Sequence, residues 1–314
     1  MFHPTLSKSG RLFFAPLIKF CNYLGKHHPF LMVQLRYFAV YKRFANLRHP
    51  KDLNEKILHI KLYKDTSRWP DLVDKYKVRD YIKGLGLEDI LVELYGVWYS
   101  PEDFAQSFDN LPNSFILKAN NGEGKGTNLV VKDKSKVSNE ELTAIVKNWL
   151  SRKDIGALVA EPQYGAIIPC VIAEQLLPTD PGHYSLTDYK IWCFEGKPYF
   201  IWVCNDRNED GNSAHVLTYD TNWQSHPEYS IFTSDYLQGE LISKPKNLDY
   251  MLEIAEKLSA GFPELRVDLY NIAGRVYFGE LTFTSQGGIN SFYTQEFLNY
   301  AGSLFSVDKL SQKK

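Results

Sequence analysis

The 314-residue sequence contains no uninterrupted hydrophobic run long enough to cross a membrane. Its two apolar stretches, at 12–20 and 30–40, are short and contain Lys19 and Arg36. Basic residues recur through this region, which argues against a cleaved signal peptide. The four cysteines include no Cys-x-x-Cys pair, so we expect buried thiols rather than a disulfide framework. These absences predict a cytoplasmic protein.

Acidic residues are missing from the first 50 positions, although the whole sequence has a formal net charge of only −1. Those positions hold eight lysines and arginines, which leaves 28 basic and 37 acidic residues, a net charge of −9, in the other 264. A basic, aromatic-rich segment suits an anionic membrane surface or an acidic polymer. The alternative is a helical region that packs on the main body with its basic side in solvent. We expect one or two amphipathic helices over residues 8–45.

The common nucleotide-binding fingerprints are also missing, since there is neither a Walker A sequence nor a Rossmann glycine spacing. A glycine-rich loop does occur at 120–126, with strand-like segments on both sides. Its glycines permit close approach of backbone N–H groups to phosphate oxygens. An ordinary hairpin turn is the alternative. The candidate phosphate-binding residues are Lys118, Asn120, Gly122, Gly124, Lys125 and Gly126.

Two carboxylates near the C-terminal end, Asp268 and Glu280, flank a Gly-containing turn at 271–274. Two strands joined there would bring the carboxylates together beside Arg266. Because alternate residues of a strand share a face, the two polar faces coincide only if the turn has an odd length or the hairpin carries a bulge. Such a pair suits Mg²⁺, which prefers oxygen ligands. The alternative is an ordinary hairpin with a solvated face.

Further candidates lie between these two motifs. Lys190 sits among residues that should be buried, and a buried cation needs an anionic partner. Arg207 follows the end of a predicted strand. Each of these cations alone fits a structural ion pair, but together with Lys118 and the acidic pair they favour contact with phosphate. Glu174 and Leu177 close an apolar strand that suits adenine, with hydrogen bonds from the backbone and aliphatic groups on the ring faces.

In this order, the motifs resemble the ATP-grasp superfamily: a lysine before a glycine-rich hairpin, a Glu-containing hinge strand, a basic strand, an arginine, and a terminal acidic pair. More narrowly, the sequence resembles the TupA-like ATP-grasp family of bacterial surface-polysaccharide biosynthesis. The similarity covers about residues 50–300. It is carried by the segments 50–56, 74–79, 95–98, 117–120, 188–190 and 279–283.

The resemblance implies that ATP phosphates are bound by Lys118 and the loop Gly122–Gly126, and that Glu174 and Leu177 lie at the adenine hinge. Lys190 and Arg207 would steady phosphate or an acyl-phosphate intermediate, while Arg266 stabilises developing negative charge.

The same resemblance implies that Asp268 and Glu280 hold Mg²⁺. Many ATP-grasp enzymes have Asn two residues after the metal-binding Glu, where this sequence has Thr282. The third ligand is therefore open among the Thr282 hydroxyl, Gln286 and Asn290.

The implied activity is ATP-dependent ligation of a carboxylate and an amine through an acyl-phosphate. The acceptor would be a glycan or uronic acid, and the donor an amine or amino acid; no nucleic-acid partner is expected. Positioning and charge neutralisation, rather than a protein nucleophile, carry such chemistry. The alternatives are a glycosyltransferase, a sugar phosphoryl transferase, or a nucleotide-binding scaffold of a polysaccharide assembly complex. In the scaffold, the basic N-terminus would be the docking surface for that complex. Whatever the activity, this segment is a candidate for peripheral contact with the inner face of the membrane or with the assembly complex.

The implied fold is α+β: two ATP-grasp lobes that clasp ATP between them, with a helical N-terminal extension. We expect the extension at 1–70, the lobe with the glycine-rich loop at 71–175, and the lobe with the metal site at 176–314.

Overall fold

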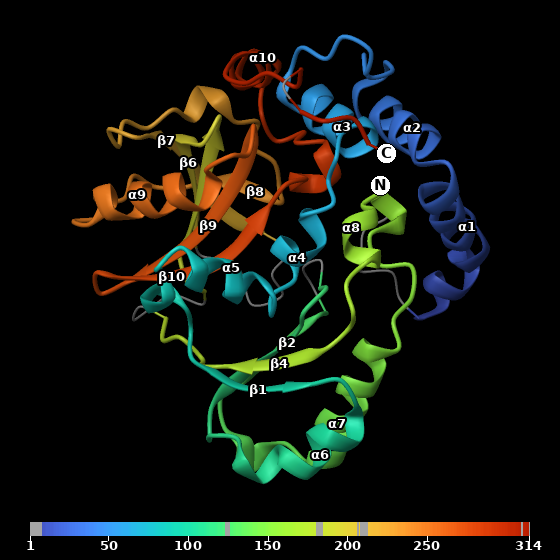
Figure 1. Ribbon diagram of the computed structural model, residues 1–314, viewed down its shortest axis with the longest axis vertical. Coiled ribbons are helices and arrows are strands. Elements are labelled where there is room, and N and C mark those ends of the chain that lie inside the picture. The colour runs from blue at the N-terminus through green and yellow to red at the C-terminus, as the bar shows by residue number, and fades with distance from the viewer. Residues whose placement is uncertain are drawn as a thin grey trace. The chain divides into compact units, whose positions relative to one another are not determined.

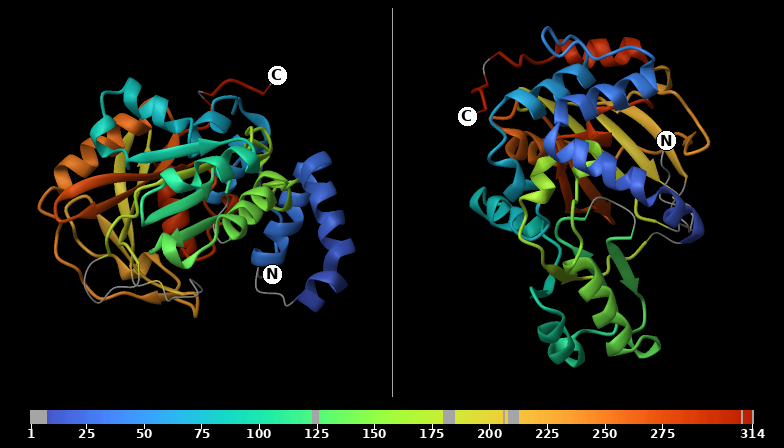
Figure 2. Two further views of the ribbon diagram at one scale, coloured as in Figure 1. Left: turned by 90° about the horizontal axis from the view of Figure 1, so that it is seen from below. Right: turned by 90° about the vertical axis from the view of Figure 1, so that its right-hand side faces the viewer.

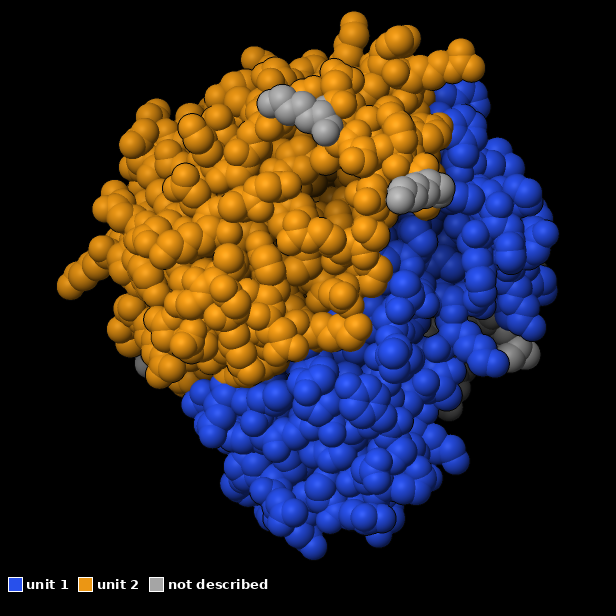
Figure 3. All heavy atoms as spheres, viewed as in Figure 1, with its two compact units in different colours: residues 1–44, 74–76, 93–176 blue, residues 45–73, 77–92, 177–314 orange. Residues whose placement is uncertain are grey.

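The structure is a computed structural model that describes residues 8–122, 126–179, 185–205, 207, 213–308 and 310–313. Its helices and strands are shown in Figures 1 and 2. The chain forms two compact units (Figure 3): unit 1 comprises residues 1–44, 74–76 and 93–176, and unit 2 comprises 45–73, 77–92 and 177–314. The chain therefore passes between the units five times, whereas three consecutive segments would need only two passages. None of the described helices is long and apolar enough to cross a membrane.

Unit 1 is built on an antiparallel sheet in the order β1-β4-β2-β3. The strands are β1 (Leu94–Trp98), β2 (Phe115–Ala119), β3 (Asn128–Val131) and β4 (Val171–Glu174). Helices α6 (Pro101–Ser107) and α7 (Asn139–Leu150) pack together on this sheet and share its hydrophobic core. Burial alternates along β2, with Phe115, Leu117 and Ala119 inside the core. Lys118 consequently lies on the face that the core leaves open.

Two consecutive helices, α1 (Lys8–His27) and α2 (Pro29–Tyr41), begin unit 1 and pack against the short 3-10 helix η4 (Ala157–Val159). Gly25 permits this contact, since a Cβ there would lie 1.7 Å from the Ala157 carbonyl oxygen. The short helix α8 (Pro162–Gly165) follows η4. The expectation of one or two helices over residues 8–45 is confirmed.

Unit 2 contains a six-stranded sheet in the order β10-β9-β5-β6-β7-β8, antiparallel except for the β7–β8 pair. Helix α9 (Leu248–Ser259) contacts β5, β6 and β9 and buries its apolar stripe, including Met251, Ile254 and Leu258. The strands are β5 (Asp188–Phe194), β6 (Lys197–Asn205), β7 (Ala214–Asp220), β8 (Tyr236–Gln238), β9 (Glu264–Ile272) and β10 (Arg275–Thr282).

Helices from both ends of the chain complete unit 2. The helix α3 (Leu53–Tyr63) begins at Asp52, whose carboxylate caps it by accepting a hydrogen bond from the Glu55 amide. The helix α3 packs on α10 (Gln295–Ser303), and the Lys56 ammonium donates to carbonyl oxygens of Gly302 and Phe305. The remaining elements are α4 (Trp69–Val73), α5 (Val78–Gly84), η1 (Glu88–Ile90), η5 (Pro227–Tyr229) and η6 (Ser285–Gly288) in unit 2, and η2 (Phe108–Asn110) and η3 (Lys134–Lys136) in unit 1.

Candidate active site

The β9–β10 hairpin brings the two predicted carboxylates together. Ala273 and Gly274 form its two-residue turn, both with positive φ, at 50° and 85°. An even turn alone would place Glu280 on the wrong face. The pairing shifts by one residue at Gly279, so that Glu280 stands opposite Asp268 and Thr282 opposite Arg266. The sequence pattern required either a turn of odd length or a bulge to bring the two polar faces together, and the hairpin has the bulge.

Gly279 is needed at the bulge because the backbone of the partner strand approaches it closely. A Cβ at this position would lie 2.9 Å from the Asp268 carbonyl oxygen and 3.4 Å from the Tyr270 ring. Any larger residue would push the two strands apart at the level of the carboxylate pair.

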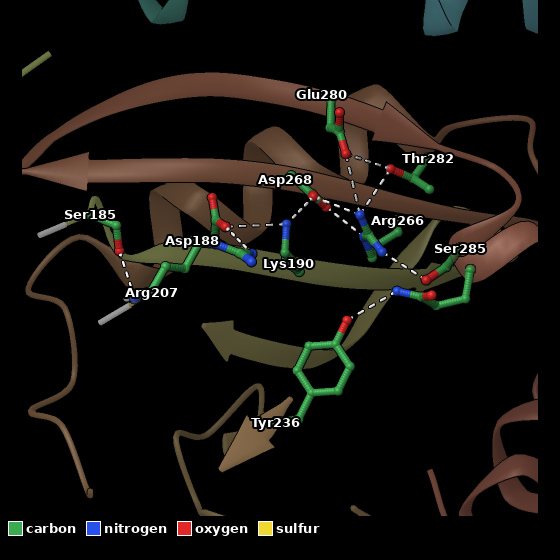
Figure 4. A network of polar contacts seen from close by, with 11 residues as sticks. Ser185, Asp188, Lys190, Arg207, Tyr236, Arg266, Asp268, Glu280, Thr282 and Ser285 are labelled. Atoms are coloured by element: carbon green, nitrogen blue, oxygen red, sulfur yellow. Dashed lines mark hydrogen bonds and ion pairs between the residues drawn. The ribbon is translucent and has the colours of Figure 1, made fainter. Parts of the chain in front are cut away.

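Asp268 is the centre of a buried ionic network, shown in Figure 4. Its side chain is only 4% exposed. Arg266, two residues earlier on the same face of β9, holds both carboxylate oxygens, with Nε–Oδ1 at 2.7 Å and Nη2–Oδ2 at 2.8 Å. Lys190 lies directly opposite on β5 and donates to Oδ2 at 2.5 Å. The buried Lys190 therefore has the anionic partner that its position requires.

The network continues along β5 through Asp188, which shares a face with Lys190. The Lys190 ammonium lies 3.5 Å from Asp188 Oδ2, and the Arg207 guanidinium donates to the same oxygen at 3.0 Å. With Glu280 at the other end, the row contains three cations and three carboxylates, so its formal charges balance.

Opposite charges in the network shift one another's pKa values. Burial alone would raise the pKa of Asp268, but Arg266 and Lys190 outweigh it and hold that pKa below its usual value. Burial alone would lower the pKa of Lys190, yet Asp188 and Asp268 keep it above the ordinary value. Both groups therefore remain charged at neutral pH. Asp188 and burial together raise the pKa of Tyr270, which stands opposite Asp188 and stays neutral.

Glu280 differs from Asp268 in being open to solvent, with 45% of its side chain exposed. Its Oε1 accepts from the Thr282 hydroxyl at 3.3 Å and lies 3.5 Å from Arg266 Nη2, both loose contacts. Thr282 itself accepts from Arg266 at 3.1 Å, so it links the arginine to the exposed carboxylate.

The donor set at this point fits Mg²⁺. Facing carboxylates beside a hydroxyl are hard oxygen ligands, and Mg²⁺ is commonly held by one or two carboxylates with substrate phosphates and water completing its shell. Among the described residues there is no group of three or more His, Cys, Asp or Glu that could hold a metal ion by itself. Two protein carboxylates lie within the number that a shared metal–nucleotide site uses.

The other two candidates for third ligand have amide nitrogens that are engaged elsewhere, and Asn290 Oδ1 is buried without a hydrogen-bond partner among the described residues. The Gln286 amide donates to the Tyr236 hydroxyl at 3.1 Å. Asn290 is fully buried, and its amide donates to the Asn54 side-chain oxygen at 2.9 Å. The Thr282 hydroxyl contacts Glu280, so we retain Thr282 as the proposed third ligand.

In unit 1, the predicted nucleotide residues Lys118 and Glu174 form an ion pair across β2 and β4. The Nζ–Oε2 distance is 2.8 Å, and the two side chains are 22% and 8% exposed. Glu174 thus holds Lys118 on the open face of the sheet. Leu177, three residues farther along, is buried in unit 2 in a small apolar cluster with Val92 and Tyr277.

The glycine-rich loop is anchored at its base. Asn120 is buried; it donates to Asp74 and to the Ile168 carbonyl, each at 3.0 Å, and accepts from the Cys170 amide at 2.9 Å. With both amide hydrogens engaged, Asn120 positions the loop in this structure rather than offering a donor to phosphate.

The glycines at the two ends of the loop serve different needs. The Lys75 ammonium donates to the Gly122 carbonyl at 2.7 Å, and a Cβ on Gly122 would collide with Thr127. Gly126 has a φ of 79°, which favours glycine. Gly124 and Lys125 lie outside the described residues.

A model of the TupA-like ATPgrasp family matches residues 55–306. The chain belongs to this family. The ATP-grasp fold and the α+β class expected from the sequence are therefore confirmed.

Solved ATP-grasp structures show weaker similarity to this family member. D-cycloserine synthetase DcsG is 16% identical with a TM-score of 0.44, over 76% of this chain and 70% of that one. D-alanine–D-alanine ligase from Bacillus anthracis is 15% identical with a TM-score of 0.39, over 68% of this chain and 57% of that one. This chain thus spans little more than half of the Bacillus enzyme. No curated protein matches the sequence.

Two residues of the candidate site in this family member were not among those predicted. Asp188 joins Lys190 to Arg207, and Ser285 accepts from Arg266 Nη1 at 2.8 Å. The spacing of Asp188 two residues before Lys190 is the signal that identifies it, because it places both side chains on one strand face. Ser285 follows the strand in η6, where strand periodicity carries no information.

Proposed function

We propose that this protein is an ATP- and Mg²⁺-dependent carboxylate–amine ligase that acts through an acyl-phosphate. Family membership supports ATP-grasp chemistry. The observation that carries the proposal is the register of the β9–β10 hairpin, which places an exposed Glu280 opposite an Asp268 that two cations hold in its ionised form. The same register would have little purpose in a hairpin whose polar face merely meets solvent.

Asp268 and Glu280, with the Thr282 hydroxyl, would hold Mg²⁺. A carboxylate offers about four lone-pair sites, and Arg266 and Lys190 occupy three of those on Asp268. The remaining site and the open Glu280 carboxylate are suited to one shared ion. Bound there, Mg²⁺ supplies neutralisation of phosphate charge during transfer.

Besides the metal ion, the proposed site in unit 2 has three positively charged side chains: Lys190, Arg207 and Arg266. Arg266 is fixed by four hydrogen-bond partners, including Ser285 and Thr282. Its orientation is set before substrate arrives, so it can stabilise charge that develops on a transferring phosphoryl group without reorganising. Lys190 and Arg207, fixed on Asp188, would steady phosphate or the acyl-phosphate.

In unit 1, the proposed nucleotide contacts are the Lys118 ammonium and the backbone of the loop Gly122–Gly126. Glu174 orients Lys118, and the segment from Glu174 to Leu177 is the proposed adenine hinge. Asn120, anchored as described, keeps the loop base in place.

In the proposed reaction a substrate carboxylate oxygen attacks the γ-phosphorus of ATP, and the bond to the β–γ bridging oxygen breaks, releasing ADP. An amine then attacks the acyl carbon, phosphate leaves with the electron pair of the C–O bond, and the amine nitrogen loses a proton. Neither step needs a protein nucleophile, which agrees with a site built from cations and carboxylates. Following the family resemblance, we propose a uronic acid or another sugar carboxylate of surface polysaccharide biosynthesis as the acceptor.

The first test is Mg²⁺-dependent binding and hydrolysis of ATP by the purified protein, with UDP-sugars in parallel and Glu280→Gln as the control. The proposal expects ATP binding by the wild type, turnover that increases when carboxylates and amines are added together, and loss of turnover in the variant. Binding of UDP-sugar instead of ATP would favour a glycosyltransferase, and transfer to a sugar hydroxyl without an amine would favour a phosphoryl transferase.

A further inference from the structure

The two N-terminal helices of unit 1 leave an unusual number of large apolar side chains in solvent. Single exposed hydrophobic residues are normal on a protein surface, whereas a cluster marks an interaction site. The exposed set falls within residues 17–44 and comprises Leu17, Phe20, Tyr23, Phe30, Leu31, Leu35, Phe38, Val40 and Phe44. Figure 2 shows these helices, in blue, side by side.

On α2 the exposed residues form a stripe. Leu31, Leu35 and Phe38 recur at helical spacing and are 45–47% exposed, while Val33 and Tyr37 on the other side are fully buried. Phe44, 62% exposed, extends this stripe because its ring centroid lies 5.2 Å from that of Phe38. The helix thus has two apolar sides, and packing against the described residues accounts for only one of them.

The helix α1 also exposes large aromatic side chains near its C-terminal end. Phe20 and Tyr23 are 56% and 55% exposed and lie one turn apart. The Tyr23 ring contacts His27 with centroids 4.6 Å apart. Together, Phe20, Tyr23, Leu31, Leu35, Phe38 and Phe44 are called the N-terminal patch.

The helices that carry the N-terminal patch have charged side chains of one sign. The first acidic residue of the chain is Asp52, so α1 and α2 contain none. Lys19, Lys26 and Lys42 are exposed on or beside the patch. Lys26 lies 3.6 Å from Asp154, with both side chains well exposed, and such a surface pair neutralises little of the positive field.

We propose that the N-terminal patch docks this protein on an anionic phospholipid surface. Helices that lie in a membrane interface present aromatic and aliphatic side chains to the acyl chains, and lysines whose ammonium groups remain at the headgroups. The helices α1 and α2 supply both components and no carboxylate of their own, and the exposed Asp154 beside Lys26 leaves the lysines in excess. The other 264 residues carry a net charge of −9 and are repelled by the same surface, so the charge asymmetry favours docking through these helices.

A soluble protein partner fits these observations less well. Protein interfaces commonly have a hydrophobic centre and a polar rim with few lysines, whereas the charged side chains of these two helices are all positive. A second copy of the chain would place lysines against lysines across a symmetric contact. The absence of a spanning helix among the described residues is compatible with a protein that lies on the bilayer.

The test is flotation of the 314-residue protein with two kinds of vesicle. One kind is neutral phosphatidylcholine, and the other contains roughly one third phosphatidylglycerol, an anionic lipid. The proposal expects binding only to the anionic vesicles and release as ionic strength rises. Leu35→Ser with Phe38→Ser should abolish binding. Lys19→Gln and Lys42→Gln should weaken the partition coefficient by about fivefold each, as expected for about 1 kcal/mol per surface cation.

Matched controls lie in unit 2, where Leu241 is 74% exposed and Lys244 is also exposed. Leu241→Ser and Lys244→Gln should leave vesicle binding unchanged. Unaltered circular dichroism and unaltered ATP hydrolysis without vesicles would show that the patch variants are folded. These two measurements also separate this inference from the proposed ligase activity.

Equal binding to neutral and anionic vesicles would overturn the proposal. Unchanged binding by the Leu35→Ser, Phe38→Ser double variant and by the two lysine variants would do so as well. A third result would also overturn it: the wild-type protein does not bind vesicles and sediments as a dimer, and the patch variants sediment as monomers. In that outcome the patch is an interface between copies of this chain.

Discussion

Both units place a lysine and a carboxylate together on an antiparallel sheet, but the two arrangements differ in how far their charges depend on one another. In unit 1, Lys118 and Glu174 form one pair with the lysine partly exposed. In unit 2, Asp268 is held by two cations, and one of these, Lys190, also contacts Asp188. Water can therefore solvate Lys118 when it leaves Glu174, whereas Lys190 and Asp268 are both too buried to be solvated on separation.

The charged residues of the two units are therefore suited to different roles. A partly exposed lysine can exchange its carboxylate partner for an incoming phosphate at little cost. A buried row must be charged and oriented before any substrate arrives, because removing one member leaves the others in a low-dielectric environment. Unit 2 therefore combines stability and proposed catalysis in the same residues, and unit 1 separates them.

The largest effect is expected from Asp268→Asn. The substitution keeps the shape of the side chain but leaves Arg266 and Lys190 without their shared anion, so unfolding should become easier by about 3–5 kcal/mol, and turnover should be lost. Urea denaturation and ATP hydrolysis measure the two effects. Glu280→Gln is the matched control: it should also stop turnover but change stability by less than about 1 kcal/mol, because its side chain is 45% exposed. Equal stability of the two variants would contradict the comparison.

A smaller effect is expected from Gly279→Ala. The new Cβ would approach the Asp268 carbonyl to 2.9 Å, so the strands must move at the carboxylate pair. We expect about 1–3 kcal/mol of destabilisation, as for overpacking elsewhere, with reduced Mg²⁺-dependent turnover. Gly84→Ala is the control, since nothing lies within 4 Å of a Cβ there. A fully active, stable Gly279→Ala protein would show that the bulge is not required.

In unit 1, Lys118→Met should weaken ATP binding about tenfold, or about 1.4 kcal/mol, while leaving the unfolding free energy close to that of the wild type. Isothermal titration calorimetry gives the first quantity and thermal unfolding the second. Lys136→Met, at a side chain that is 80% exposed, should change neither. If Lys118→Met unfolds the protein as readily as Asp268→Asn does, the two units do not differ as proposed.

The smallest effect concerns pH. The folded pKa of Asp268 lies below its ordinary value of 3.8, so its contribution to stability is present above that value and is lost as pH falls through the folded pKa. Between about pH 6 and 9 the stability difference between wild type and Asp268→Asn should therefore stay constant, and below about pH 4 it should narrow. Denaturation curves across this range measure the difference. A difference that widens in acid would contradict the assigned shift.

Periodicity predicts single elements of this chain, whereas the ATP-grasp fold was expected from the family resemblance. The regular apolar spacing over 248–259 predicts a helix, and α9 occupies Leu248–Ser259. The pattern at 167–177 indicates a long strand, yet β4 occupies only Val171–Glu174. Tertiary pairing sets those limits, since β4 extends only where β1 and β2 supply hydrogen-bond partners.

The site could be predicted in part for similar reasons. Strand alternation requires a bulge to bring Asp268 and Glu280 together, but it does not locate that bulge at Gly279. The strands β7 and β8 could not be predicted, because the region around them carries no motif. Their pairing is parallel and depends on contacts between segments about 20 residues apart.

The packing of α3 against α10 has a consequence for folding during translation. Lys56 bonds to Gly302, a residue 246 positions later, so at a translation rate of 5–20 residues per second α3 waits roughly 12 to 50 seconds for its partner. Every residue of unit 1, by contrast, has been made once position 176 is reached. Unit 1 can therefore fold while the ribosome is still at work. Unit 2 must keep its early helices from aggregating until the last strands and α10 emerge, which makes it the part of the nascent chain most in need of a chaperone.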